Sequence, residues 1–217
     1  MACLGAAIVS TAPLPVAAQS GWRVAWGLTV PYNLPMPLRI DQGGESELDI
    51  TARYAAKPFD RPITWEFRLG RWRQGEAWEL DLVHHKIYLD NGPPEVEKFS
   101  ISHGFNLLTL QRAWRRERVE WRVGTGLVLA HPESTVRGRM LAETGGPLGG
   151  GYYVAGPTAS IAAARPIAVT HGACLVLESK LAISYASVPV AGGRAHVYNV
   201  FVQLAVLLGY GAVGATE

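Results

Sequence analysis

Between Glu47 and Tyr210 the chain repeats one pattern, a run of about ten residues that is apolar at every second position and is ended by a turn. Trp65, Phe67 and Leu69, for example, alternate with charged residues or glycine. A period of two is typical of a β-strand, whose successive side chains point to opposite faces. Because nearly every run has this pattern and no helical segment is available to cover a sheet, the sequence predicts an all-β fold. The expected form is a closed antiparallel transmembrane β-barrel with apolar side chains outside and polar side chains in its lumen.

The composition limits the class of protein. Hydrophobic residues make up 48% of the 217 residues, and the mean hydropathy is only +0.10. Outside the N-terminus no run approaches the roughly 20 consecutive apolar residues that a transmembrane helix needs. The net charge is +2, and the basic residues are spread along the strands, which argues against nucleic acid as a partner. We therefore expect one barrel domain, located in the bacterial outer membrane.

Eight strands are predicted for the barrel. Their expected ranges are 47–57, 62–72, 76–89, 99–112, 117–131, 151–164, 172–186 and 196–210. The run 22–30 is a further good strand, and pairing it with 34–40 gives an alternative of ten strands. Pro35 and Pro37 argue against that alternative, because a proline in a closed sheet removes a backbone donor. The connections are expected to alternate between short turns and longer loops, such as 132–150 and 188–194.

The two ends of the chain are assigned separately from the barrel. Residues 1–18 are small and apolar, and they predict a signal peptide cleaved after Ala18. A lipoprotein signal at Cys3 is the rival interpretation. Cleavage leaves Cys174 as the only cysteine, so no internal disulfide is expected. The predicted divisions are 1–18 signal peptide, 19–46 N-terminal segment or first strand(s), 47–210 transmembrane β-barrel and 211–217 C-terminal tail.

Aromatic residues mark the expected membrane interface. Trp72, Trp78 and Trp114 flank short turns, as an interfacial girdle requires. The last run alternates from Tyr198 to Tyr210 as an outward stripe that ends in an aromatic residue. In these features the chain resembles small bacterial outer-membrane β-barrel proteins, and its last run resembles their C-terminal assembly signal, although seven residues follow Tyr210. The resemblance implies outer-membrane lipids as surroundings and the barrel assembly machinery as a partner during insertion.

Two hairpin registers, estimated from symmetric turns, place polar residues in the lumen. The first sets Arg68 opposite Asp81, and the second sets Asp81 opposite Asn106. Small barrels fill their interiors with side chains, and interleaved charges can satisfy one another there. The predicted polar network of the lumen is Glu66, Arg68, Asp81, Asn106, Glu120 and Arg122.

The histidines are the candidates for catalysis. The second register sets His85 opposite Ser102, which would supply a base and a nucleophile, but Asp81 lies about 13 Å along the strand from His85, too far for a direct hydrogen bond. The same register sets His84 opposite His103 with both side chains facing lipid, where polar groups are costly and invite a functional hypothesis. Anchoring at the headgroups is the simpler interpretation. The candidate catalytic residues are His84, His85, Ser102 and His103.

His103, Phe105 and Asn106 resemble the motif of the outer-membrane lipid A deacylases, in which a histidine is followed two residues later by a serine and then by an asparagine. Phe105 stands in the position of the serine nucleophile, so the match is partial. The resemblance implies removal of acyl chains from lipid A. No segment matches the catalytic part of the lipid A palmitoyltransferase barrel.

No metal site and no cofactor are predicted, because zinc takes three or four ligands and the carboxylates near His84 and His103 are expected on the opposite face. Lys86, Arg137 and Arg139 lie near the expected outer loops and are candidates for binding the phosphates of lipopolysaccharide. The favoured function is a structural or lipid-interacting barrel with a lumen filled by side chains. The alternatives are a hydrolase or acyltransferase acting on lipid A through the histidines, and a narrow channel.

Overall fold

The computed structural model describes residues 20–142, 145–146, 150–170 and 172–211. The predicted signal peptide and nearly all of the predicted C-terminal tail lie outside the described residues. The described strands are β1 (Gly21–Asn33), β2 (Met36–Gln42), β3 (Leu48–Ala52), β4 (Tyr54–Ala55), β5 (Trp65–Arg73), β6 (Glu76–Leu89), β7 (Val96–Arg116), β8 (Val119–Ala130), β9 (Glu133–Val136), β10 (Arg139–Met140), β11 (Tyr153–Thr170), β12 (Ala173–Val190) and β13 (Gly193–Gly211). The described part of the chain contains no helix that is long and apolar enough to cross a membrane.

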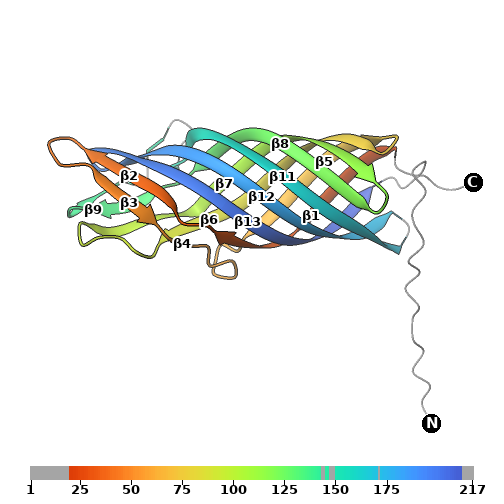
Figure 1. The fold of residues 1–217 in the computed structure, drawn as a ribbon, viewed down its shortest axis with the longest axis horizontal. Coiled ribbons are helices and arrows are strands. Elements are labelled where there is room, and N and C mark those ends of the chain that lie inside the picture. Colours follow the sequence, from red (N-terminus) through yellow and green to blue (C-terminus); the bar gives the residue numbers. More distant parts are fainter. Residues whose placement is uncertain (1–19, 143–144, 147–149, 171, 212–217) are drawn as a thin grey trace, which may run out of the picture.

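Eight of these strands close into a barrel (Figure 1). The ring runs β1, β5, β6, β7, β8, β11, β12 and β13, with every neighbouring pair antiparallel and β1 paired to β13 to close it. Closure removes the unpaired strand edges that an open sheet would expose to lipid. The predicted all-β fold and the predicted number of eight strands are confirmed.

The ring differs from the prediction in which segments form it. β1 is a full ring strand, whereas the predicted strand 47–57 is not a separate member of the ring. β2 continues β1 after a break at Leu34 and Pro35, because it pairs with residues 193–197 of β13 just beyond the part that β1 covers. β4 likewise pairs with the end of β6 beyond the part that β5 covers. The ten-strand alternative is therefore wrong, since the prolines interrupt one strand without starting another.

The barrel has two distinct ends. We call the end that holds Gly21 and Gly211 the near end, and the opposite end the far end. Tight turns at 74–75 and 117–118 connect strands at the near end, where β11 and β12 also meet, and the β2–β3 hairpin and the β9–β10 hairpin extend the far end. The 188–194 connection is a tight turn at 191–192, not the long loop expected. The expected loop 132–150 is partly formed by the strands β9 and β10.

An apolar belt covers the outside of the ring. Along β13, Val202, Leu204, Val206 and Leu208 are exposed and alternate with buried residues. The neighbouring strands continue the belt with Val30, Phe67, Leu69, Leu80, Leu110, Val123, Leu127, Ile161, Leu177 and Ile183. An outward apolar face of this kind matches lipid and is unfavourable in water.

Exposed aromatic residues form a girdle around the near end. Trp22, Trp78, Trp121 and Tyr210 are all more than two-fifths exposed. Trp72, which was predicted to belong to this girdle, instead lies buried in the lumen. It shares the inward parity of Arg68 on β5, and its indole nitrogen donates a hydrogen bond to Glu79 at 3.0 Å.

The lumen is divided into two halves of different character. The near half holds the charged residues of the ring, whereas the far half holds a hydrophobic core. This core packs inward-facing side chains of the ring against those of β2, and it includes Leu38, Ile40, Ile87, Ile101, Phe105, Val128, Val136, Val197 and Phe201. The sequence predicted a polar lumen throughout. The far half differs because strands that extend beyond the apolar belt are surrounded by water and stabilise themselves by burying apolar side chains between them.

Candidate functional site

A β-bulge in β7 shapes the outer wall of the barrel near its far end. His85 pairs with Phe105 and Ile87 pairs with Ile101, so one residue of β6 faces the three residues 102–104 of β7. The extra residues cannot join the ladder and are displaced from it. His103 is therefore directed to the outside of the barrel, where Ser102 also lies because it shares the face of Ser100.

Gly104 makes this bulge sterically feasible. Its φ angle of 143° lies in a region that residues with a Cβ atom rarely adopt. A Cβ atom at this position would lie 2.2 Å from the side-chain nitrogen of Asn106. The bulge therefore depends on a residue without a side chain.

The register between β6 and β7 differs from the predicted one by three residues, of which the bulge accounts for two and the position of the turn between the strands for one. His84 pairs with Asn106 instead of His103, and Asp81 pairs with Thr109 instead of Asn106. A shift by an odd number of residues turns every side chain to the other face. Asn106 is thus corrected from the lumen to the outer wall, where its Oδ1 lies 2.7 Å from Nδ1 of His84. The ring of His84 also stacks on Trp65, with 5.4 Å between centroids.

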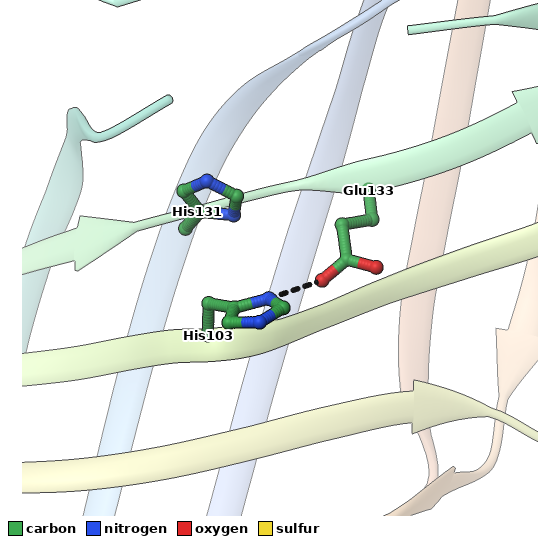
Figure 2. Close-up of side chains that lie close together, drawn as sticks. All are labelled: His103, His131 and Glu133. Carbon is green, nitrogen blue, oxygen red and sulfur yellow. Dashed lines mark hydrogen bonds and ion pairs between the residues drawn. The ribbon is translucent and has the colours of Figure 1, made fainter. Parts of the chain in front are cut away.

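The bulge brings together a polar group that we call the outer-wall cluster, made up of Ser102, His103, His131 and Glu133. Figure 2 shows the last three of these side chains. Glu133 begins β9 and pairs with Ser100, on the same face as the bulge. Its Oε1 lies 2.7 Å from Nδ1 of His103 and accepts a hydrogen bond from Ser102. Nδ1 of His103 lies 3.3 Å from Oγ of Ser102. The cluster lies beyond the apolar belt, at the level where lipid headgroups would be expected.

The charge of Glu133 is well stabilised. Burial raises the pKa of its carboxyl group, but hydrogen bonds from Lys98, Ser102 and His103 outweigh burial and lower the pKa to about 2. Lys98 contacts the second carboxylate oxygen at 2.8 Å. Glu133 is therefore a hydrogen-bond acceptor and a potential metal ligand, and it is a poor base near neutral pH.

His131 occupies the inner side of the cluster. It is buried, and its ring lies edge-on to His103 at 5.3 Å and to Tyr152 at 5.1 Å between centroids. The hydroxyl of Tyr152 donates a hydrogen bond to the backbone oxygen of His103 at 2.8 Å. Tyr152 thereby fixes both histidines. Nδ1 of His131 has no hydrogen-bond partner among the described residues.

The arrangement of the predicted catalytic residues can now be stated. Ser102 and His103 meet in the outer-wall cluster, and His84 lies on the same wall beside Asn106. His85 lies in the lumen, where its Nε2 is 2.9 Å from Oδ1 of Asn33. The predicted luminal pairing of His85 with Ser102 is wrong, because Ser102 lies on the outer face of the sheet, as Ser100 does, whereas His85 faces the lumen.

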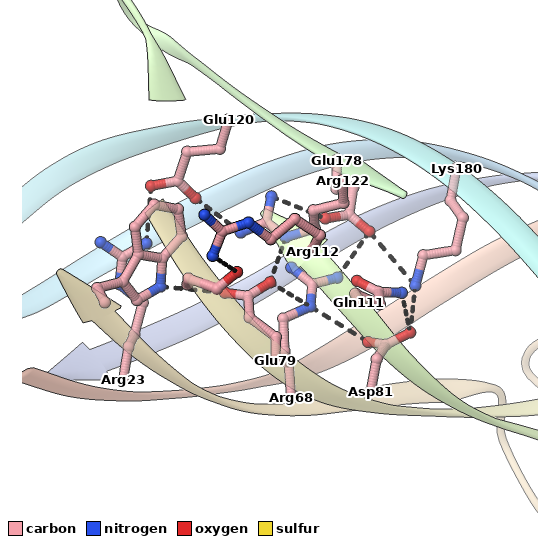
Figure 3. A network of polar contacts seen from close by, with 12 residues as sticks. Arg23, Arg68, Glu79, Asp81, Gln111, Arg112, Glu120, Arg122, Glu178 and Lys180 are labelled. Carbon is pink, nitrogen blue, oxygen red and sulfur yellow. Dashed lines mark hydrogen bonds and ion pairs between the residues drawn. The ribbon is translucent and has the colours of Figure 1, made fainter. Parts of the chain in front are cut away.

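The near half of the lumen is filled by a network of ion pairs (Figure 3). Arg68 contacts Glu66, Asp81 and Glu178, and Lys180 contacts the same three carboxylates. The network extends toward the near end through a second group of contacts. These join Arg122 to Glu79, Glu120 and Glu178, and Glu120 to Arg23 and Arg115.

The charges of the network are balanced, and the cavity among its side chains is small. Its five acidic side chains face five basic ones, so each buried charge has a partner of opposite sign, as burial requires. The cavity between Arg23, Arg68, Glu79 and Arg122 has a volume of only about 10 Å³. That volume is roughly what one water molecule needs. The structure places the predicted Glu66, Arg68, Asp81, Glu120 and Arg122 in this network.

Lys86 does not have the exposure that headgroup binding requires. It faces the outer wall, but the segment 56–64 covers it, and its Nζ donates to the backbone oxygens of Lys57 and Asp60 at 2.8 Å each. Its prediction as a headgroup-binding residue is corrected to a role in holding this segment against the barrel. The segment itself presents Phe59, which is 70% exposed, beside the exposed Arg61.

Arg137 and Arg139 lie at the tip of the far end. Arg137 donates to Oε1 of Gln42 and to the backbone oxygen of Ser46, and Arg139 pairs with Glu45 at 3.1 Å. Both arginines thus join the β9–β10 hairpin to the β2–β3 hairpin. Whether they also bind lipid phosphates stays a prediction.

Several members of these sites were missed by the sequence analysis. Glu178 and Lys180 alternate with the apolar residues of β12, so their inward parity was available as a signal. Glu133 and His131 had no such signal, because they meet His103 only through the bulge and the pairing of β9 with β7.

The closed ring of an even number of strands, its apolar belt and its aromatic girdle define the class of the protein. They are the features of an outer-membrane β-barrel protein, with tight turns at the near end and longer connections at the far end. The predicted class and the predicted location in the bacterial outer membrane are confirmed.

Solved structures of similar architecture include three small barrels. The chain is similar to Neisserial surface protein A, with 9% identity over 87% of this chain and 96% of that one and a TM-score of 0.44. It is similar to Ail of Yersinia pestis, with 7% identity over 88% and 99% of the two chains and a TM-score of 0.42. It is also similar to the outer membrane protein AlkL, with 14% identity over 100% and 99% and a TM-score of 0.48. No protein-family model and no curated protein matches the sequence.

Proposed function

We propose that this protein is a non-conducting outer-membrane barrel that interacts with lipids of the outer leaflet through its outer wall. The observation that carries the proposal is the separation of the two polar groups of the molecule. The lumen network satisfies its own charges, and the cavity between Arg23, Arg68 and Arg122 has room for about one water molecule, whereas the outer-wall cluster lies just beyond the apolar belt. The groups available for contact with other molecules are therefore on the lipid side.

The wall near the cluster has the chemistry of a headgroup-binding surface. Lys57 and Arg61 are exposed in the segment 56–64, and Lys98 is half-exposed beside Glu133. Nζ of Lys57 lies 4.5 Å from the ring centre of Tyr88, which holds this charge against the barrel. Basic side chains at this level attract the phosphates of anionic lipids such as lipopolysaccharide. The neighbouring Phe59 adds an apolar side chain that inserts among the lipids.

Retention of lipid during purification tests this proposal. The full protein and a Lys57→Ala, Arg61→Ala double variant are extracted in mild detergent, and the lipopolysaccharide that stays bound is measured by mass spectrometry. We expect the double variant to retain several-fold less lipopolysaccharide than the unchanged protein. The matched control removes two exposed arginines at the near end, Arg71→Ala with Arg73→Ala, and retains as much as the unchanged protein. Equal retention by all three proteins would overturn the proposal.

A second candidate function is hydrolysis of an ester bond in an outer-leaflet lipid. The contacts among Ser102, His103 and Glu133 favour it, because they join a hydroxyl, an imidazole and a carboxylate. In this reaction Oγ of Ser102 would attack the ester carbonyl while His103 takes its proton, and His103 would return the proton to the departing alcohol. Water would then release the fatty acid from the acylated serine. In the structure, however, the hydroxyl donates to a carboxylate that is a poor base, so Ser102 is only weakly activated.

Lipid A analysis separates the two candidates. Cells that produce the unchanged protein, Ser102→Ala, or no protein are compared by mass spectrometry of their lipid A. Hydrolysis predicts fewer acyl chains with the unchanged protein alone. The lipid-interacting role predicts identical acylation in all three. If lipid A lost acyl chains with the unchanged protein but not with Ser102→Ala, the protein would be a hydrolase instead.

A further inference from the structure

The outer-wall cluster contains three possible metal ligands, which come from β7, from β9 and from the short connection between β8 and β9. His103 lies in the bulge of β7, His131 directly follows β8, and Glu133 begins β9. One donor atom from each of the three side chains lies within 4.8 Å of the other two (Figure 2). Two imidazoles and one carboxylate form a ligand set that binds zinc in known enzymes.

A buried nitrogen of His131 that lacks a hydrogen-bond partner indicates that a ligand binds here. His131 is only 8% exposed, and its Nδ1 has no hydrogen-bond partner in the described part of the chain. Buried polar atoms are nearly always paired, because an unpaired one loses its interactions with water and gains none in return. A metal ion at the centre of the cluster would accept this lone pair.

The residues around the three ligands hold them in place. Tyr152 packs on the ring of His131 and donates to the backbone oxygen of His103. Lys98 contacts Oε2 of Glu133 at 2.8 Å, which leaves Oε1 directed toward the histidines. Contacts of this kind orient ligands before a metal binds and strengthen its binding.

We propose that His103, His131 and Glu133 bind one divalent transition-metal ion, for which Zn²⁺ fits best. Zinc ligands at 2.0 to 2.2 Å in a tetrahedron lie about 3.4 Å from one another. The present donor atoms reach that spacing by shifts of about 1 Å, in which the direct contact between His103 and Glu133 is replaced by shared coordination. The two nitrogens favour zinc over Mg²⁺ and Ca²⁺, which prefer oxygen ligands.

Three protein ligands leave the fourth position of the zinc open. The side chain of His103 is 57% exposed, so the open position faces the outside of the barrel at the level of the headgroups. Water or a phosphate oxygen of a lipid headgroup would complete the coordination. The metal site does not depend on the proposed lipid-interacting function, since it rests on the positions of the three side chains alone.

Metal titration of the purified protein tests the proposal. The full chain, folded in detergent and carrying no affinity tag, is stripped with a chelator and titrated with ZnCl₂ in a calorimeter, and with CoCl₂ while the visible absorption is recorded. We expect one equivalent of Zn²⁺ to bind and a large excess of Mg²⁺ not to displace it. Bound Co²⁺ should show the intense visible bands of a tetrahedral site. Absence of stoichiometric binding by the folded protein would overturn the proposal.

Three variants assign the binding to the cluster. His131→Phe keeps an aromatic ring against Tyr152 but removes the nitrogen, and Glu133→Gln keeps the shape but removes the charge. Each should weaken Zn²⁺ binding by at least about 100-fold. That is the largest loss expected when a residue that only hydrogen-bonds to a metal ligand is removed, and the loss of a ligand itself should be no smaller. His196→Ala is the matched control, since it removes a part-exposed histidine that lies 3.5 Å from a carboxylate oxygen of Asp41 elsewhere on the barrel. Its affinity should be unchanged, and far-ultraviolet circular dichroism verifies that every variant is folded. Equal affinity in His131→Phe and the unchanged protein would contradict the assignment.

Discussion

Oε1 of Glu133 lies 2.7 Å from Nδ1 of His103, although 30 positions separate the two residues in the sequence. Two features of β7 create this contact. The bulge at 102–104 directs His103 outward, and the pairing of Ser100 with Glu133 puts the carboxylate on the same face. The other buried carboxylates of the described residues point into the lumen, whereas Glu133 lies on the outer wall beside His103. The outer wall is therefore chemically distinct from the lumen.

Arg68 should be one of the most important residues for stability. Arg68→Ala leaves Glu66, Asp81 and Glu178 with one cation fewer in a buried site, so we expect the free energy of unfolding to fall by about 3–5 kcal/mol. Urea titration of the protein in lipid vesicles measures this change. Arg112→Ala is the control, because Arg112 forms a partly exposed pair with Glu76 and its loss should cost no more than about 1 kcal/mol. Similar costs for the two variants would show that the lumen network does not stabilise the barrel.

His85 should support the fold and not the outer-wall cluster. Its ring stacks on Phe201 with 4.2 Å between centroids, and it contacts Asn33 in the lumen. His85→Ala should therefore lower the free energy of unfolding by about 2–4 kcal/mol, as expected when a large buried side chain is removed. Its Zn²⁺ affinity, measured in the same preparation, should equal that of the unchanged protein. A stable variant with impaired metal binding would mean that the two faces of the sheet have been assigned the wrong way round.

The barrel should not conduct ions. The charged near half leaves a cavity of about 10 Å³, and the far half is closed by the hydrophobic core. Planar-bilayer recordings of the reconstituted protein should show no conductance steps, in contrast to a general porin inserted under the same conditions. Reproducible single-channel steps would show that the lumen opens, and the narrow channel would then replace the closed barrel as its function.

Gly104 should control the position of His103. Gly104→Ala introduces a Cβ atom at a φ of 143° and 2.2 Å from the side chain of Asn106, so the bulge must change shape at a cost of about 1–3 kcal/mol. We expect Zn²⁺ binding to weaken by at least about tenfold, since small displacements of supporting groups have effects of this size. Gly44→Ala is the control, because its φ is also positive, at 82°, while a Cβ atom there meets nothing within 4 Å. The control should lose some stability and keep its metal affinity, and equal affinities in both variants would refute the role of the bulge.

The barrel itself was predictable because alternation is a local property of the sequence. Each strand carries its own inward and outward pattern, so seven of the eight ring strands and the orientation of Arg68 and Arg122 follow without knowledge of the neighbours. The outer-wall cluster was not predictable in the same way. It depends on the bulge, which directs His103 outward although Ile101 and Phe105 on either side of it face inward, and no turn-based estimate of register contains a bulge.

The far half of the lumen shows a second limit of alternation. The pattern tells which residues share a face, but it does not tell how far the strands extend beyond the membrane. Leu38 and Ile40 were assigned to a segment that the prolines would exclude from the sheet, yet they pack in the core because β2 pairs with β13. Distant pairing decides the environment of such residues.

The direction of the side chains on β13 is the property on which the whole account depends, and site-directed spin labelling tests it most directly. Labels are placed singly at positions 202 to 208 in a protein whose own cysteines are replaced by serine, and the protein is reconstituted in lipid vesicles. Collisions with oxygen dissolved in lipid should be frequent at Val202, Leu204, Val206 and Leu208 and rare at Gln203, Ala205 and Leu207. If instead the oxygen-accessible positions were Gln203, Ala205 and Leu207, with positions 202, 204, 206 and 208 shielded, the outer and inner faces of β13 would be reversed. The assignment to a membrane would then be contradicted.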